Sequence, residues 1–97
     1  MKIPDHNKQL LYDMGFLTWT CFQVITMKKI KEGSDIEAKL ADKFFGDVYK
    51  WGTSKTIYHV GERDWFKRDS EKGEEAEDIQ AERAYKTWLE ENNYEME

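Results

Sequence analysis

The sequence predicts a small, mainly α-helical domain. Apolar residues recur at three- and four-residue spacing in several stretches, and helix-capping residues flank those stretches. A length of 97 residues allows one hydrophobic core. Because 39% of residues are hydrophobic and 14% aromatic, that core depends on a few large side chains, including four tryptophans. We therefore expect one domain over residues 1–97, with three helices and an irregular segment between the second and the third.

The first helix is expected to begin near residue 5, just after Pro4, with apolar residues at helical spacing from Leu10 onward. It leads into residues 14–27, MGFLTWTCFQVITM, where 14 residues pass without a charge. This run is shorter than the roughly 20 residues that a membrane-spanning helix needs, and it contains three threonines and a glutamine. We therefore expect it to be buried in the protein core and expect no membrane partner.

The conformation of residues 16–27 is left open by the sequence. Their apolar, aromatic and β-branched residues fit a period of two, which is typical of a strand. A helical ridge at three- and four-residue steps also runs through Leu10, Met14, Leu17, Cys21 and Val24. Lysines follow this ridge, and Gly33 stands where a left-handed helix C-cap is expected. Helix is our main prediction; the alternative is an α+β fold in which residues 16–27 pair with a strand near residues 56–60.

The second helix has the clearest signals in the chain. Ser34 and Glu37 match a capping box at its N-terminus. The apolar residues that follow at helical spacing are Ile36, Leu40, Ala41, Phe44, Phe45 and Val48. We expect this helix to end at Trp51 and Gly52. Because Gly33 and Ser34 leave almost no linker, two helices here would form a tight antiparallel hairpin.

The third helix is expected over residues 70–92, with Asp69 or Ser70 as its N-cap. Its first turns are acidic, and its apolar face comes late, as Ala81, Ala84, Tyr85, Trp88 and Leu89. The two asparagines at 92 and 93 would end it, and we expect the last residues to be frayed.

Charge is unevenly distributed along the chain. The net charge is −5, but residues 1–69 hold 12 basic and 10 acidic residues, whereas residues 70–97 hold 3 and 10. This acidic end disfavours nucleic acid and anionic membranes, and it suits a partner protein with a basic surface. The single cysteine, Cys21, excludes an intramolecular disulfide, and the polar N-terminus does not resemble an export signal. We therefore expect a cytoplasmic protein.

No pattern of catalytic, metal-binding or phosphate-binding residues stands out. His59 has Glu62 and Asp64 close by, but one histidine with two loop carboxylates is common by accident. Cys21 lies inside the apolar run, which favours a small core residue over a nucleophile. We therefore expect neither enzymatic activity nor a cofactor.

Two charged segments are candidates for contact with a partner. The first interleaves aromatic and basic residues in RDWFKR: Arg63, Trp65, Phe66, Lys67 and Arg68. Tryptophan and arginine dominate protein interfaces, although the same segment also fits a loop held in place by its aromatic side chains. The second comprises carboxylates of the acidic helix: Glu74, Glu75, Glu77 and Asp78. These fit either a mimic of nucleic acid that occupies a basic groove or an ordinary solvated helix face.

The apolar run suggests self-association, because so small a domain has little chain with which to cover a helix that is apolar on nearly every side. We expect a homodimer in which Phe16, Trp19 and Phe22 contribute to the interface. The function that fits these features is that of a small interaction protein, an inhibitor or adaptor of the kind encoded by phages and other mobile elements. The alternative is a nucleic-acid or nucleotide ligand-binding protein that uses a basic and aromatic surface.

Overall fold

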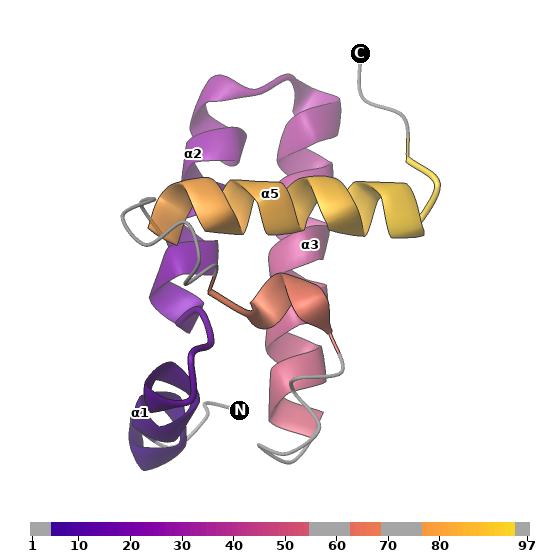
Figure 1. Cartoon of the computed structure of the whole chain (residues 1–97). Helices are drawn as coiled ribbons and strands as arrows, with labels where there is room; N and C mark the ends of the chain where they lie inside the picture. Colours follow the sequence, from indigo (N-terminus) through magenta and orange to yellow (C-terminus); the bar gives the residue numbers. More distant parts are fainter. Residues whose placement is uncertain (1–4, 55–62, 69–76, 95–97) are drawn as a thin grey trace.

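A computed structural model describes residues 5–54, 63–68 and 77–94 of the chain. It contains helices α1 (Asp5–Asp13), α2 (Trp19–Glu32), α3 (Asp35–Ser54) and α5 (Glu77–Glu91), with the short 3-10 helix η1 (Asp64–Phe66) before α5. α2 and α3 lie side by side as an antiparallel hairpin, and α5 crosses both of them (Figure 1). The prediction of a mainly α-helical domain is confirmed, and no strand occurs within these described ranges.

Most of residues 16–27 belong to the helix α2, but the apolar ridge predicted from Leu10 to Val24 is interrupted. Gly15 adopts a left-handed φ of +92°, which a helix cannot continue through, and it separates α1 from α2. Thr18 then caps α2, and its hydroxyl accepts a hydrogen bond from the backbone N–H of Cys21 at 3.4 Å. The strand alternative is therefore wrong for the part of this segment that forms α2. Its expected partner, residues 56–60, lies outside the described residues.

The segment before α2 is tied to η1 by the backbone. The N–H of Leu17 donates to the carbonyl of Phe66 at 2.6 Å, and the N–H of Arg68 donates to the carbonyl of Gly15 at 2.8 Å. These bonds form an isolated antiparallel bridge between Phe16 and Lys67. The turn at Gly15 therefore fixes the position of the RDWFKR segment, 50 residues further along the chain.

The hairpin between α2 and α3 depends on Gly33, but not in the predicted way. Its φ is −86°, so the expected left-handed cap is wrong. Glycine is required because a Cβ atom at this position would lie 2.5 Å from the backbone oxygen of Lys29. The capping residue Ser34 accepts a hydrogen bond from the N–H of Glu37 at 3.2 Å, as half of a capping box does.

Aromatic rings form the centre of the core. Phe22 of α2 and Phe44 of α3 are both fully buried, and their ring centroids lie 5.9 Å apart in an edge-to-face arrangement. Around this pair pack Trp65 and Phe66 of η1, together with Tyr85 and Trp88 of α5. Each such pair contributes about 0.5–1.5 kcal/mol beyond the burial of its surface. Every described helix therefore contributes to the core, and α1 does so through the buried side chain of Leu11.

One lysine links three helices at the edge of this core. Lys29 of α2 donates to Glu82 of α5 at 2.9 Å and lies 3.3 Å from Glu37 of α3. Burial acts to lower the pKa of Lys29, but the hydrogen bonds and charges of the two glutamates outweigh burial and raise it. The hydrogen bond from Lys29 lowers the pKa of Glu82 below its ordinary value.

Candidate functional site

The RDWFKR segment turns its aromatic side chains inward and exposes its three cations to different degrees. Trp65 and Phe66 are 7% and 1% exposed, so both belong to the core. Lys67 is exposed, whereas Arg63 and Arg68 are half-buried. The structure thus shows the segment as a loop held in place by its aromatic residues. The ring of Phe66 is therefore covered by the protein itself, whereas Lys67 is open to solvent.

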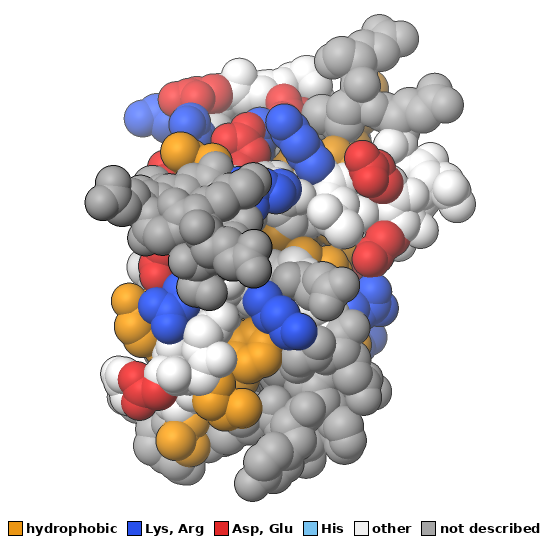
Figure 2. All heavy atoms as spheres, viewed as in Figure 1, with side chains coloured by type: hydrophobic (Ala, Val, Ile, Leu, Met, Phe, Trp, Pro, Cys, Tyr) orange, Lys and Arg blue, Asp and Glu red, His pale blue; other side chains and the backbone are white. Residues whose placement is uncertain are grey.

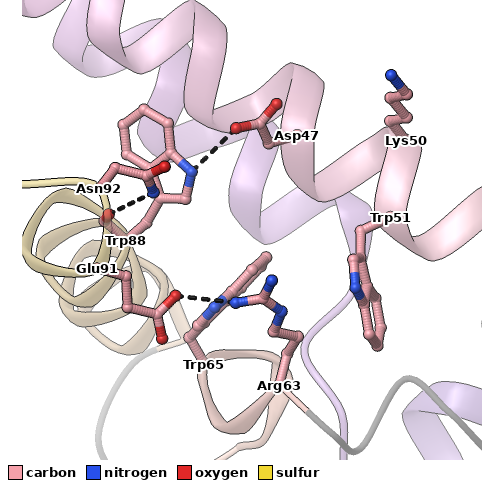
Figure 3. Close-up of a pocket in the computed structure, with 8 residues that line it drawn as sticks. All are labelled: Asp47, Lys50, Trp51, Arg63, Trp65, Trp88, Glu91 and Asn92. Carbon is pink, nitrogen blue, oxygen red and sulfur yellow. Dashed lines mark hydrogen bonds and ion pairs between the residues drawn. The ribbon is translucent and has the colours of Figure 1, made fainter.

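A pocket of about 250 Å³ opens beside this loop (Figure 3). The pocket lies where three elements meet, because α3, α5 and the chain around η1 each provide part of its wall. Its lining residues are Asp47, Lys50, Trp51, Arg63, Trp65, Trp88, Glu91 and Asn92. Three of the four tryptophans in the chain therefore surround one small pocket, with two carboxylates and two cations among them.

Helix periodicity places the aromatic and acidic groups on the same faces. Asp47 and Trp51 are four residues apart on α3, and Trp88 and Glu91 are three apart on α5, so each pair projects from one side of its helix. The indole N–H of Trp88 donates to Asp47 at 3.1 Å, which holds the two helices together at the pocket. Asp47, Trp51, Trp88 and Glu91 were not predicted as site residues: their spacing places each pair on one helix face, but it does not show that the two faces meet.

Arg63 projects toward the middle of the pocket in the close-up view (Figure 3). Its Nη1 donates to Glu91 Oε2 at 2.9 Å, and its guanidinium carbon lies 5.9 Å from the centre of the Trp51 ring. A cation at this distance from an indole face is attracted by the ring quadrupole. The pocket therefore already holds a guanidinium group between a carboxylate and a tryptophan.

Trp65 contributes a donor that is not used. Its Nε1 atom is buried and has no hydrogen-bond partner among the described residues. Leaving such a group unsatisfied costs about 1–3 kcal/mol, so a polar group in this state within the wall of a pocket is unusual.

The end of α5 gives the pocket its rim. Asn93 has a left-handed φ of 60°, and the N–H of Tyr94 turns back to the carbonyl of Leu89 at 2.9 Å, as in a Schellman cap. The two predicted asparagines do end the helix. Tyr94 was expected to be frayed, but its ring lies 5.5 Å from that of Trp88 and its hydroxyl accepts a bond from Lys43 at 2.7 Å. Residues 95–97 lie outside the described part of the chain.

A second groove, of about 330 Å³, lies on the other side of Trp65. Its lining residues are Trp65, Lys67, Arg68, Gln80, Arg83, Ala84 and Thr87. Arg68 also stacks over the ring of Tyr12, 4.0 Å from its centroid, and donates to the backbone carbonyl of Tyr12. This groove is therefore more basic than the tryptophan-lined pocket.

The acidic helix does not present a continuous acidic face over its described part. Glu74 and Glu75 lie outside the described residues, as does Glu71, the remaining carboxylate of residues 70–76. Asp78 is exposed, whereas Glu77 is engaged inside the molecule and accepts a hydrogen bond from the thiol of Cys21 at 2.9 Å. Where the surface is described, acidic and basic side chains are interspersed (Figure 2).

Cys21 is buried, as expected of a core residue. Burial raises the pKa of the thiol, and the hydrogen bond to Glu77 raises it further. A raised pKa keeps the thiol protonated, which does not suit a nucleophile.

The residues expected in a homodimer interface lie inside the single chain. Phe16 and Trp19 are each 7% exposed and Phe22 is fully buried. The apolar side chains that α2 leaves exposed are instead Val24, Met27 and Ile30. On the neighbouring helix α3, Ile36 is 70% exposed.

The described residues contain no cluster of three or more histidine, cysteine, aspartate or glutamate side chains suited to hold a metal. His59 and Glu62, from the group considered in the sequence, lie outside those residues. None of the helices in the described ranges is both long and apolar enough to cross a membrane. Comparison with protein-family models, curated proteins and solved structures finds no match to this chain. The site is therefore argued from its own geometry.

Proposed function

We propose that this chain is a non-enzymatic interaction protein that binds another protein through the tryptophan-lined pocket. The observation that supports this most is the meeting of Trp51, Trp65 and Trp88 with Arg63 around one pocket. Tryptophan and arginine are the residues most enriched among those that dominate binding energy at interfaces, especially around small pockets near the centre of a contact. The charged residues at its rim then select the partner and its orientation.

The partner that suits this surface is basic. The chain carries a net charge of −5, which attracts a basic protein over a distance and repels nucleic acid. At the pocket itself, Asp47 and Glu91 provide carboxylates beside aromatic rings. A small acidic protein of this kind suits the role of an inhibitor or adaptor, and its single cysteine suits a reducing cytoplasm.

A capture experiment with matched charge variants tests this proposal. The wild-type protein, the pocket variant Asp47→Asn/Glu91→Gln and the control Asp78→Asn/Glu90→Gln are each used as bait in host lysate, and captured proteins are quantified by mass spectrometry. Both variants remove two negative charges, and asparagine at position 47 still offers an oxygen to the indole of Trp88. We expect the pocket variant to capture roughly tenfold less of a basic partner, and the control to capture as much as wild type.

The opposite pattern would contradict the proposal. If the control loses the partner while the pocket variant keeps it, the interface lies on the acidic face of α5. Circular dichroism of each variant checks that the helices are retained.

Nucleic-acid or nucleotide binding is the second candidate, and one observation favours it. Lys67, Arg68 and Arg83 line the groove on the other side of Trp65, so cations and an aromatic side chain occur together there. Binding of single-stranded nucleic acid through phosphates should weaken steeply as salt rises. Absence of binding at low salt would reject this candidate.

Self-association is a separate proposal. With the predicted aromatic residues buried, a homodimer would form through the exposed apolar face of α2, where Val24 and Met27 are 50% and 60% exposed. Light scattering should then give twice the monomer mass for wild type and the monomer mass for Met27→Glu. A monomeric wild type would reject the homodimer.

A further inference from the structure

Arg63 lines the pocket and makes there the contacts that an arginine ligand would make. The loop that carries it is fixed by the backbone bridge to residues 15–17, and its guanidinium reaches back between Glu91 and Trp51. A carboxylate on one side and an indole face on the other are the groups that proteins use to recognise an arginine from a partner. In this chain, both are already engaged by an arginine of the chain itself.

We propose that Arg63 holds the place of an arginine side chain from the partner protein, which displaces it on binding. This inference rests on the proposed function, and it adds the chemistry of the group recognised. The pocket measures about 250 Å³ with Arg63 in its wall, below the roughly 300–1,000 Å³ typical of small-molecule sites, and moving Arg63 out adds only the space of one side chain. Arginine is favoured over lysine because its planar guanidinium both stacks on indoles and bonds carboxylates in a bidentate way.

Displacement of Arg63 costs little. The side chains of Arg63 and Glu91 are each 42% exposed, and ion pairs with that exposure contribute weakly to stability because water and salt screen them. Because Arg63 is only half-buried, little burial opposes its movement into solvent. By contrast, Trp65 and Trp88 are 7% and 3% exposed, so two of the indoles that would receive the ligand stay fixed.

The charges that line the pocket suit a cationic ligand better once Arg63 has moved away. With Arg63 in place, the lining carries two carboxylates and two cations; without it, the lining carries the same two carboxylates, Asp47 and Glu91, and one cation, Lys50. The guanidinium of Arg63 has no acceptor atom, so it cannot satisfy the buried N–H of Trp65.

The test measures how strongly a minimal arginine probe binds when Arg63 is removed. N-acetyl-L-arginine amide is titrated into wild type, Arg63→Ala and Arg63→Gln, followed by the indole N–H resonances of the labelled protein. Lys31→Ala, on the exposed surface of α2, removes the same charge away from the pocket and serves as the control. N-acetyl-L-citrulline amide, which has nearly the same shape without the charge, is the control ligand.

We expect wild type to bind the arginine probe with a Kd on the order of millimolar, as suits one side chain. Both Arg63 variants should bind it roughly three- to tenfold more tightly, because they remove one exposed ion pair and one cation–π contact that compete with the ligand. Lys31→Ala should match wild type, and citrulline should bind none of the proteins measurably.

Two results would overturn the inference, and they differ in what they say about the proposed function. If the wild type binds arginine and both Arg63 variants bind it no more tightly, Arg63 is not a competing occupant, and the pocket remains the partner site. If no variant binds the probe and Asp47→Asn/Glu91→Gln still captures the partner, both the inference and the use of this pocket fail.

Discussion

Gly33 gives the sharpest prediction about what holds the helical hairpin together. At its φ of −86° an alanine adopts the same backbone without strain, so conformational freedom does not explain this glycine. The lack of space for a side chain explains it, because an added Cβ would lie 2.5 Å from the Lys29 backbone oxygen and 2.7 Å from Glu37 Oε2. The backbone oxygen cannot move without opening the last turn of α2. We therefore expect Gly33→Ala to lower the free energy of unfolding by about 1–3 kcal/mol, as overpacking does.

Gly46→Ala is the matched control. Gly46 lies inside α3, and an added Cβ there would meet nothing within 4 Å. The same chemical change should therefore raise the free energy of unfolding by about 0.5–1 kcal/mol, since alanine is the better helix former. Urea denaturation followed by circular dichroism measures both values. If Gly33→Ala stabilises the protein as much as Gly46→Ala does, the close approach at the hairpin is not real and this reasoning fails.

Three further predictions concern polar groups that are buried or half-buried. Tyr85→Phe should leave the free energy of unfolding unchanged or raise it by up to about 1 kcal/mol, because the Tyr85 hydroxyl is buried without a hydrogen-bond partner among the described residues. A free energy of unfolding lowered by more than about 1 kcal/mol in urea denaturation would contradict this. Glu77→Gln should lower the raised pKa of Cys21 and speed alkylation of its thiol at pH 8, while an unchanged rate would show that Glu77 does not hold the thiol proton. Lys29→Met should weaken the pH dependence of stability in acid. The pKa of Glu82 is lowered in the folded protein, so Glu82 contributes stability above its unfolded pKa, near 4.5, and that stability is lost as pH falls through the folded value. Equal slopes of the free energy of unfolding against pH in wild type and variant would refute the pairing.

Local signals in the sequence were sufficient for much of the fold. The capping box at Ser34 and the periodic apolar residues after it predicted α3, and the buried Ala41, Phe44 and Val48 lie on its expected face. The asparagines at the end of α5 were also identified. The break at Gly15 was not, because a ridge of apolar residues passes through it and only the positive φ shows that the chain turns there.

The helix or strand question at residues 16–27 depended on contacts far along the chain. The buried residues of α2 at Trp19, Phe22 and Ile25 pack against α3, η1 and α5, whereas Val24 stays half exposed. Which of several apolar stripes faces the core is decided by those partners, and local periodicity does not contain that information.

The candidate site, too, could be predicted from the sequence only in part. RDWFKR was identified from its composition, and two of its residues, Arg63 and Trp65, line the pocket. The other walls come from helices whose tryptophans were expected only as core residues or helix ends. Their assembly required the crossing of α3 and α5, which brings Trp88 to within 3.1 Å of Asp47 although 41 residues separate them in the chain. Sequence spacing places residues on a helix face, but it does not say which two faces meet.

The most direct test of the central claim is to observe the pocket itself in the wild-type protein. The indole N–H resonances are recorded as N-acetyl-L-arginine amide is added, with Trp19 as an internal reference because it packs against Phe22 and Phe66 outside the pocket. We predict saturable shifts of Trp51, Trp65 and Trp88, little change at Trp19, and no shifts with the citrulline analogue. Equal shifts with both compounds, or no saturable shift at the three pocket tryptophans, would contradict recognition of a cationic side chain at this site.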